Sequence, residues 1–537
     1  MKWTDVPGQT PLRRFTPDGD THSTGLTLLA AAIAVAVFSP VLWLLLRTAD
    51  VGLSRIVPLM VRPTAVETLV NSMALVAVVT GASVLIGVPL AVLTTRTDLP
   101  FRRFWTVAVS LPLVIPSYIG AFAFVSAFGP RGIFADALSV TLPPLYGFHG
   151  AALVLTLFVY PYVFISTRAA LLTFDGSLTE AARTLNHGRL DAFRRVTLPR
   201  IVPGIAAGAL LVALYTLSDF GTPAIMHFDT FTRMIYVEFN TFARDLAALL
   251  SVQLLIVTTV ILAIESRIGA DRNAAYAKGE RGGTDALRIS LGRWRWPATL
   301  FPASIVTATL VVPIGVLLVW LFRSNPGYAG GFAFHWSYGF NSLGVSALAA
   351  LLATVAALPI AYLSTADGGY LSRLFERTTY VGYAMPGIVL GLSLVYFGSA
   401  YAPWLYQTIP LLLFAYVVRF MPQAVGTIRS SFLQVDPRLV EASRTLGRSQ
   451  LSTFRRVTFP LVLPGIAAGG ALVFLTTMKE LPATLMLHPT GFKTIVTYIW
   501  LVQGSGNYGS AAVPALALVA ISALSMFVIL ARGGYDG

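Results

Sequence analysis

The sequence predicts an all-α membrane protein with about twelve transmembrane helices, arranged as two tandem six-helix repeats. Composition is the first indication, because 55% of the 537 residues are apolar and only 12% are charged, whereas soluble domains carry about 25% charged residues. The second is a series of apolar runs of about 20 residues, the length at which a helix spans a bilayer. The third is an internal repeat, in which the second half of the chain follows the pattern of the first with few gaps.

Each apolar run defines one predicted span. In chain order the predicted spans cover residues 25–47, 69–95, 104–128, 149–167, 201–218, 246–264, 298–322, 342–364, 379–400, 410–428, 464–480 and 511–531. Two of them, 149–167 and 464–480, are predicted as spans broken by proline. The first apolar run is too long for the core of a cleaved signal peptide, so we interpret it as a signal anchor.

The net charge of +14 does not indicate a nucleic-acid partner, because the cations are concentrated in alternate connections between spans. These connections contain Lys2, Arg13 and Arg14; Arg96, Arg102 and Arg103; Arg183, Arg189, Arg194, Arg195 and Arg200; and Arg267, Arg272, Lys278, Arg281, Arg288, Arg293 and Arg295. The positive-inside rule makes their face cytoplasmic, together with both termini. The opposite loops hold fewer cations, although Arg55, Arg62 and Arg233 weaken the bias.

Matching residues define the two halves. Pro116 recurs as Pro386 at an offset of 270 residues, and Glu180 recurs as Glu441 at an offset of 261. Each half holds six spans, an even number, so both halves share one orientation and are related by an axis along the membrane normal. We therefore divide the chain into a cytoplasmic tail at 1–24, a first membrane domain at 25–265, a cytoplasmic linker at 266–297 and a second membrane domain at 298–537.

A polar, arginine-rich segment follows the fourth span of each half. Glu-Ala-Ala-Arg-Thr-Leu at 180–185 recurs as Glu-Ala-Ser-Arg-Thr-Leu at 441–446, and Phe-Arg-Arg-Val-Thr follows both copies at the same distance. Apolar residues recur at helical spacing within each segment, which predicts amphipathic helices. Between the helices stands Gly447 in one copy and Asn186 in the other, and these residue types tolerate the left-handed conformation. Each segment is therefore predicted to be a helix, a left-handed turn and a second helix.

This pattern of Glu-Ala-Ala, three residues, Gly, nine residues and Val-Thr-Leu-Pro resembles the loop of permease subunits in binding-protein-dependent ABC importers. The resemblance covers nearly the whole chain and implies two copies of an ABC ATPase subunit and an external solute-binding protein as partners. It also implies a multi-pass location in the bacterial inner membrane. The ATPase contact would then be formed by Glu180, Ala181, Ala182 and Asn186 in the first half, and by Glu441, Ala442, Ser443 and Gly447 in the second.

The alternative for these segments is a pair of amphipathic helices lying on anionic lipid. Lipid binding needs charge but not a fixed sequence, so the register kept between the two copies favours a protein partner.

Glycines four residues apart open the fifth and eleventh spans. They are Gly204 and Gly208 in the first half and Gly465 and Gly469 in the second. Small residues at this spacing let membrane helices approach closely. We expect them to pack the central helices across the pseudo-twofold axis rather than to bind a ligand.

An acidic residue follows each of these spans, Asp219 in the first half and Glu480 in the second. Ionisable groups at membrane depth are costly and often functional, so the pair is a candidate for the translocation path of a cationic or oxygen-liganded cargo. The alternative is a local role, in which the acids cap re-entrant turns or Glu480 pairs with Lys479.

The segments around these acids are most similar to ferric-iron permeases, although thiamine, sulfate, putrescine and phosphonate permeases share much of the pattern. The outer loops 219–244 and 481–510 are candidates for docking of the binding protein, through Tyr236, Tyr498, Trp500 and Tyr508.

Catalytic chemistry is not expected of this chain. The sequence lacks the Gly-x-x-x-x-Gly-Lys-Ser/Thr phosphate loop, so ATP and magnesium belong to the separate ATPase subunit and no cofactor is expected here. It has no cysteine, and its six histidines are scattered, so no metal site is predicted. The main alternative, an ion-coupled secondary transporter, calls for ionisable groups in mid-span, whereas most charges here lie at span ends.

Overall fold

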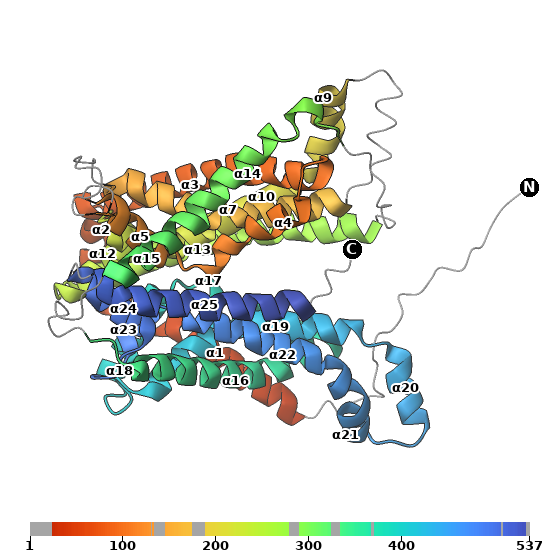
Figure 1. Ribbon diagram of the computed structural model, residues 1–537. Helices are drawn as coiled ribbons and strands as arrows, with labels where there is room; N and C mark the ends of the chain where they lie inside the picture. Colours follow the sequence, from red (N-terminus) through yellow and green to blue (C-terminus); the bar gives the residue numbers. More distant parts are fainter. Residues whose placement is uncertain are drawn as a thin grey trace, which may run out of the picture. The chain divides into compact units, whose positions relative to one another are not determined.

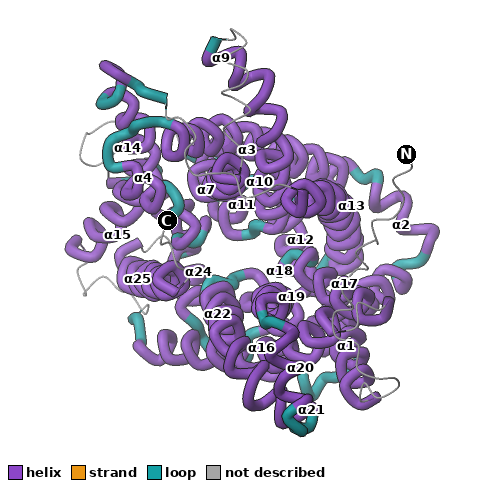
Figure 2. The backbone as a smooth tube through the Cα atoms, turned by 90° about the vertical axis from the view of Figure 1, so that its right-hand side faces the viewer, coloured by secondary structure: helices purple, strands orange, loops and turns teal. Residues whose placement is uncertain are grey.

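The computed structural model describes residues 24–129, 132–133, 145–173, 188–278, 289–323, 333–366, 370–505 and 508–532. The named elements within these ranges are helices, as Figures 1 and 2 show. One isolated bridge joins Thr97 and Ile289.

Nine helices of the described residues are long and apolar enough to cross a membrane, and two sharply bent pairs raise the number to eleven. Every predicted span lies on one of these helices, on a bent pair or, for the twelfth, on α25. In the first half the helices are α1 (Thr24–Asp50), α3 (Pro63–Arg96), α4 (Arg102–Ala108) with η1 (Leu111–Val114) and α5 (Ser117–Phe128), α7 (Gly147–Thr173), η2 (Phe193–Thr197) with α10 (Leu198–Ser218), and α13 (Arg244–Lys278). The second half opens with the run Gly292–Arg323, which includes α14 (Leu300–Val306) and α15 (Val312–Arg323). It continues with α16 (Trp336–Ala366), α17 (Tyr370–Ala384) with α18 (Gly387–Ala400), α19 (Ile409–Gln434), α21 (Gln450–Thr453) with η7 (Phe454–Thr458) and α22 (Phe459–Met478), and α25 (Tyr508–Arg532).

The breaks lie elsewhere than the sequence predicted. Pro161 and Pro464 are inside the continuous helices α7 and α22. The bent pairs instead turn by 91° before Pro116 and by 100° before Pro386, the two prolines matched by the repeat. Both have extended backbone (ψ 138° and 145°) and immediately precede a new helix. The prediction of broken spans at 149–167 and 464–480 was therefore wrong, because neighbouring helices in a membrane protein can accommodate a proline without a break.

The described residues form two compact units that do not coincide with the tandem halves. Unit 1 comprises the described residues up to Leu42 together with Leu343–Tyr383 and Thr408–Met478, and unit 2 comprises Trp43–Ser342, Ala384–Gln407 and the residues from Lys479 onward. Most of the first helix of the chain is thus grouped with helices of the second half. The run Gly292–Arg323, which opens the second half, is likewise grouped with helices of the first.

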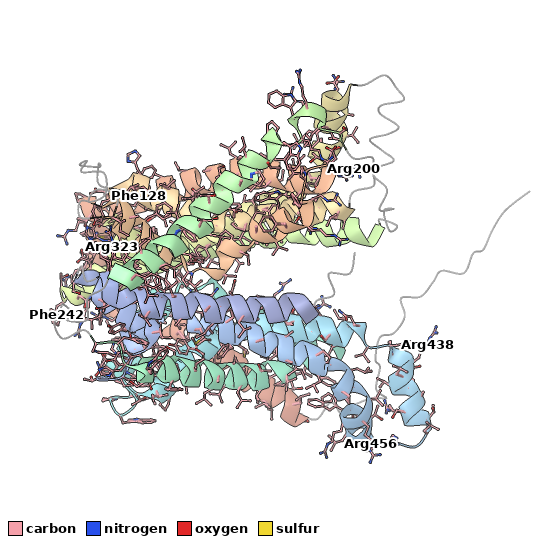
Figure 3. The ribbon with its side chains drawn as sticks, viewed as in Figure 1. Phe128, Arg200, Phe242, Arg323, Arg438 and Arg456 are labelled. Carbon is pink, nitrogen blue, oxygen red and sulfur yellow. The ribbon has the colours of Figure 1, made fainter. Side chains whose placement is uncertain are left out.

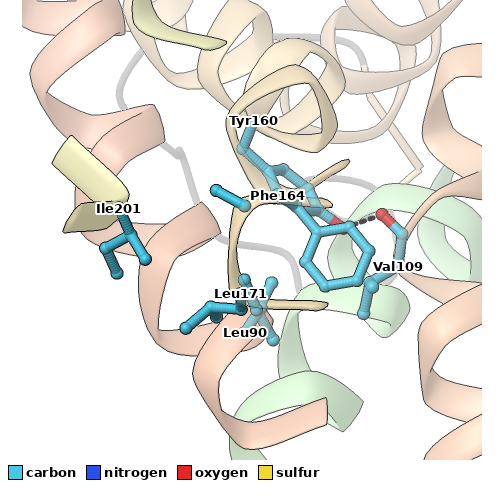
Figure 4. Packing of buried hydrophobic residues seen from close by; sticks show 8 residues of the cluster. Leu90, Val109, Tyr160, Phe164, Leu171 and Ile201 are labelled. Carbon is cyan, nitrogen blue, oxygen red and sulfur yellow. Dashed lines mark hydrogen bonds between the residues drawn. The ribbon is translucent and has the colours of Figure 1, made fainter. Parts of the chain in front are cut away.

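The core of unit 2 contains residues from both halves of the chain. Helices α3, α7 and α10 pack against one another and bury Leu90, Ala91, Val109, Tyr160, Phe164, Ala170, Leu171 and Ile201 (Figure 4). Phe301 and Ile305 of the Gly292–Arg323 run pack against this cluster. The buried Tyr160 hydroxyl donates a hydrogen bond of 2.8 Å to the Val109 carbonyl, which removes the cost of an unpaired polar group.

The connections between the helices of unit 2 lie at two opposite ends of the unit. Phe128, Phe242 and Arg323, which end or precede spans, lie at one end of the unit, and Arg200 at the start of α10 lies at the other (Figure 3). The end with Phe128, Phe242 and Arg323 is called the outer end below, and the opposite end the inner end.

Candidate functional site

The second copy of the repeated polar segment folds into a helical hairpin, called the 437–453 hairpin here. Its first helix is α20 (Pro437–Thr445), whose N-cap residue Asp436 accepts a hydrogen bond of 2.9 Å from the Arg438 backbone N–H. Gly447 follows with φ 80°, and α21 then leads through η7 into α22. The predicted helix, left-handed turn and helix are all present in this copy.

The hairpin exposes both charge and apolar surface. Glu441 and Ala442 are exposed, and so are Leu439, Leu451 and Leu446, the last to 81%. Arg438 and Arg456 lie at the same end of unit 1 (Figure 3). Leucines exposed beside arginines and a carboxylate on a short, capped hairpin are typical of a protein-docking surface.

Ser443 differs from the rest of its predicted contact set. Its side chain is only 6% exposed, and its hydroxyl lies 3.0 Å from the Thr453 hydroxyl of α21. Ser443 therefore ties the two helices of the hairpin together. Its place in the ATPase contact set, where it replaces an alanine of the pattern, stays a prediction.

The first copy of the segment, with Glu180, Ala181, Ala182 and Asn186, lies outside the described residues. The element that follows it is described. A π-helix at η2 (Phe193–Thr197) leads into α10 just as the π-helix η7 leads into α22. Equal sequences thus form equal elements where both copies can be compared.

The repeated glycines lie at close helix contacts, but with a different partner from the one predicted. A Cβ built on Gly208 would stand 2.7 Å from Val163 Cα of α7, and one built on Gly469 would stand 3.2 Å from Ala424 Cα of α19. Gly204 and Gly465 likewise approach α7 and α19. The nearest partner of each pair is the preceding span of the same half, so the prediction of packing across the pseudo-twofold axis is corrected.

Asp219 ends α10 at the outer end of unit 2. Its Oδ1 accepts a hydrogen bond of 2.5 Å from the Ser117 hydroxyl, and its Oδ2 accepts one of 3.0 Å from the Thr222 backbone N–H. Ser117 opens α5, directly after the bend at Pro116, and its hydroxyl also accepts from the Tyr215 hydroxyl at 3.3 Å. The carboxylate therefore caps the short helix α11 (Gly221–Ile225) and joins it to α5 and α10.

Glu480 occupies the equivalent place in the second half. It is buried, and its Oε1 accepts a hydrogen bond of 3.2 Å from the Ala483 backbone N–H at the start of α23 (Pro482–Leu487). Lys479 beside it donates to the Leu113 carbonyl of the first half at 3.2 Å. Both acids thus make the local capping bonds that the alternative interpretation predicted.

The two acids also act electrostatically on the same two tyrosines. The charges of Asp219 and Glu480 both act on Tyr118 and Tyr215. The Tyr118 hydroxyl is buried and has no hydrogen-bond partner among the described residues. Capping and a role in transport are therefore compatible, because the carboxylates and an unpaired phenol share a buried polar cluster, called the outer polar cluster here.

Aromatic rings join the outer loops of the two halves. Phe220 is buried, with its ring centroid 5.0 Å from Tyr236 of α12 (Phe231–Asn240) and 5.1 Å from Trp500 of α24 (Ile495–Gly504). Tyr498 is buried between Phe334 and Tyr338, so it is not on a docking surface, contrary to the prediction for that residue. Tyr508 packs against Phe122 and Trp320.

Other charged residues of the outer loops are paired within unit 2. Arg47 and Arg55 both reach Asp245, at 2.7 Å and 3.5 Å, and Arg233 pairs with Asp229 one helical turn away. Partial burial lowers the pKa of the Arg233 guanidinium from its usual value. Two of the three arginines that weakened the charge bias are thus offset by local acids. Among the described residues no group of three or more His, Asp or Glu side chains is placed to hold a metal ion.

The comparison with known families accounts for the duplicated membrane helices and the repeated polar segment. The sequence profile described as "Binding-protein-dependent transport system inner membrane component" matches residues 83–269 and again 353–531. The chain belongs to this family and carries its membrane domain twice. The matches begin inside α3 and α16, which leaves α1 and the Gly292–Arg323 run mostly or wholly outside the family domain.

Named relatives agree with the family. The chain is 33% identical over 507 residues to the Fe(3+)-transport system permease protein FbpB 2 of Haemophilus influenzae, covering 94% of this chain and 97% of that protein. It is 25% identical to the ferric transport system permease protein FbpB of Actinobacillus pleuropneumoniae, over 86% of this chain and 70% of the relative. The molybdenum transport system permease protein ModB of Mycobacterium tuberculosis is 30% identical over 45% of this chain and 89% of its own length.

Sequence reasoning found the two acids but missed their neighbours Ser117, Tyr118 and Tyr215. One available signal pointed to the first two, because they follow Pro116, which recurs as Pro386 in the repeat. A proline repeated at the same point of two spans predicts a shared bend, and side chains next to such a bend in a membrane often line a path.

Proposed function

We propose that this chain forms the membrane pathway of an ABC importer for ferric iron. A solute-binding protein delivers the metal at the outer end of unit 2, and two copies of an ABC ATPase bind the repeated polar segments, one per half. The inner end is cytoplasmic on this proposal, and both termini are on that side. The cargo is a substrate in transit, so the permease needs weak oxygen ligands along a path and not a tight metal site.

The outer polar cluster supports a cationic cargo. Asp219 accepts a hydrogen bond from the Ser117 hydroxyl, which in turn accepts from the Tyr215 phenol, and the charges of Asp219 and Glu480 both act on Tyr118 and Tyr215. Oxygen donors of this kind suit hard cations, whereas buried carboxylates repel an oxyanion such as molybdate. The likeness to a ferric-iron permease at 33% identity over 94% of this chain points the same way.

The 437–453 hairpin supports an ATPase partner. Glu441 offers a carboxylate to an arginine or a helix N-terminus of the partner, and Leu439, Leu446 and Leu451 offer apolar surface around it. Glu180, Ala181, Ala182 and Asn186 make the equivalent contact in the first half, which gives one ATPase per half. Gly447 at φ 80° fixes the angle between the two hairpin helices, so a push on α20 is transmitted through α21 to α22.

Alternating access then requires the outer loops to separate. In the described conformation Phe220, Tyr236 and Trp500 hold the outer loops of the two halves together. ATP-driven approach of the two ATPases would part these rings and admit cargo from the binding protein, and hydrolysis would restore the ring contact.

The observation that carries the proposal is the duplicated family domain together with the acidic outer cluster. The test is transport by the purified chain, reconstituted in vesicles with its ATPase and binding protein. We expect ferric iron to enter only with ATP and all three components present, and molybdate to remain outside. Iron uptake driven by a proton or sodium gradient without the ATPase would establish the secondary-transporter alternative, and molybdate uptake would overturn the assignment of cargo.

A further inference from the structure

A concave basic pocket lies at the inner end of unit 2, separate from the outer polar cluster. It has a volume of about 420 Å³. Its walls come from the connection between α3 and α4 and from the segment that precedes α14. The lining residues are Thr97, Asp98, Leu99, Phe101, Arg102, Arg103, Phe104 and Arg295.

Backbone bonds hold the two walls together. Asp98 N–H donates to the Ile289 carbonyl at 3.3 Å, and Ile289 N–H donates to the Arg96 carbonyl at 2.8 Å. The Asp98 carboxylate accepts a hydrogen bond of 2.8 Å from the Leu291 backbone N–H. This carboxylate therefore serves as an anchor between the walls, and the pocket keeps a fixed form although both walls are short connections.

The charge of the pocket is positive. Arg102, Arg103 and Arg295 line it, against the single acid Asp98. The complementary ligand is an anion with several oxygen atoms, because guanidinium groups bind phosphate through paired N–H donors.

Two exposed aromatic residues, Phe101 and Phe104, line the pocket, and two more, Trp294 and Trp296, are the chain neighbours of its Arg295. Phe101 is 72% exposed and Trp296 is 65% exposed, and Phe104 and Trp294 are exposed as well. All four lie where a span begins, at the level of a membrane interface, where tryptophan in particular is enriched because its ring is amphipathic. A soluble anion gains nothing from such a rim, whereas a lipid gains contacts for its glycerol and upper acyl chains.

The second half of the sequence does not repeat the residues that line this pocket. The residues at the matching offset to Phe101, Arg102, Arg103 and Phe104 are Leu371, Ser372, Arg373 and Leu374. One of the two arginines and both rings are therefore replaced, which separates this pocket from a general excess of cations on the cytoplasmic face.

We propose that the pocket binds the headgroup of an anionic phospholipid of the inner leaflet, with Arg103 and Arg295 as its phosphate ligands. The leaflet follows from the orientation proposed above. The lipid would bridge the first half and the start of the second, where the Thr97–Ile289 pairing already joins them. Cytoplasmic basic pockets between transmembrane helices commonly recognise such headgroups.

Native mass spectrometry of the full-length chain tests this by counting bound cardiolipin, phosphatidylglycerol or phosphatidylcholine at equal concentration. The double variant R103Q/R295Q should bind its tightest anionic lipid roughly tenfold more weakly, because each arginine near a headgroup contributes appreciably to attraction. The control R377Q removes an exposed arginine from α17, the matching helix of the second half, and should change binding by less than about twofold.

Two results would overturn the proposal. One is equal loss of anionic lipid in R377Q and in R103Q/R295Q, which would show a diffuse charge effect. The other is unchanged lipid binding together with weaker binding of the ATPase in R103Q/R295Q, which would assign the pocket to a protein. Neither measurement uses cargo or transport, so an error in the proposed substrate leaves the outcome interpretable.

Discussion

At the outer end of the first half, Asp219 is held by the Ser117 hydroxyl and the Thr222 N–H, whereas in the second half Glu480 is held by the Ala483 N–H. The residue that matches Ser117 is Gly387, which has no side chain to donate. Both acids cap a short helix, so the duplication preserves the backbone role. The residues beside the acid differ, because the serine that binds Asp219 in the first half is replaced by glycine in the second.

The same contrast recurs deeper in the bundle. Tyr162 and Tyr215 form a ring contact with centroids 5.9 Å apart, and at the matching positions the Thr476 hydroxyl donates to Gln423 Oε1 at 3.0 Å. The hairpins differ in the opposite sense, because Ser443 and Thr453 correspond to Ala182 and Ala192. The two halves therefore share one scaffold, and they have diverged in the polar contacts placed on it.

Among the variants that compare the two halves, charge reversal on both hairpins should have the largest effect on transport. We expect E180K/E441K to reduce transport by on the order of 100-fold or more, since like charges placed at an interface cost several kcal/mol. Proteoliposome uptake and co-purification of the ATPase measure the effect. The single variants E180K and E441K show whether the halves couple equally.

A double variant that still co-purifies with the ATPase and transports normally would remove the hairpins from coupling. Correct insertion of the variant in the membrane is the control, and we expect it because the Glu441 side chain is exposed.

Neutralising the two acids tests whether the bonds of Asp219 to Ser117 and Thr222 carry function. D219N should lower iron uptake by about tenfold, because an amide offers only one acceptor for the two donors that the carboxylate now satisfies, and bonds to a charged group are worth about 1.5–3 kcal/mol. E480Q should lower it less, by about threefold, since an amide oxygen can still cap α23.

The control for these variants is E238Q, which removes an acid from α12 in the same outer loop. Uptake that falls equally in all three variants would indicate a general charge effect, and normal uptake in D219N would leave Asp219 with capping alone.

Substitution of the repeated glycines by alanine tests how closely the helices pack in each half. G208A should destabilise the fold by about 1–3 kcal/mol, because its Cβ would meet the Val163 backbone at 2.7 Å, and overpacking of this kind costs that much. G469A should cost less, about 1 kcal/mol, since its nearest contact is 3.2 Å.

Thermal unfolding in detergent, followed by tryptophan fluorescence, measures this difference. Gly81 on α3 has open space around it, so G81A is the matched control and should be neutral. A larger loss in G469A than in G208A would contradict the proposed order.

Much of the fold followed from residue patterns, because span length, charge bias and duplication are properties of single segments. Gly447 in a left-handed turn was predictable in the same way, since the conformation follows from the residue type. The partner of each helix was not predictable. Periodicity says that Gly208 lies on a close-packed face, but not that α7 of the same half fills it.

The bends and the exchanged helices were missed for a related reason. Pro161 and Pro116 look alike in sequence, and only their packed neighbours decide that α7 stays continuous while the chain turns before Pro116. The Gly292–Arg323 run reads as the first span of the second half, and its contact with the Tyr160 cluster of the first half is tertiary. The burial of Ser443 was not predictable either, because an exposed motif and a buried hydroxyl can share one short helix.

The Ser443–Thr453 pair allows the smallest and most specific test. S443A leaves the Thr453 hydroxyl buried without its partner, which should cost about 1 kcal/mol of local hairpin stability, measured by hydrogen exchange of the α20 and α21 amides. S443A/T453A should recover most of this loss, because it recreates the alanine pair of the first half and leaves no buried donor unpaired. T445A, which alters an exposed hydroxyl of α20, is the control.

If S443A instead weakens ATPase binding while hydrogen exchange is unchanged, then Ser443 contacts the partner, as the sequence predicts. If exchange changes and binding does not, then Ser443 and Thr453 hold the two helices of the hairpin together and take no part in docking.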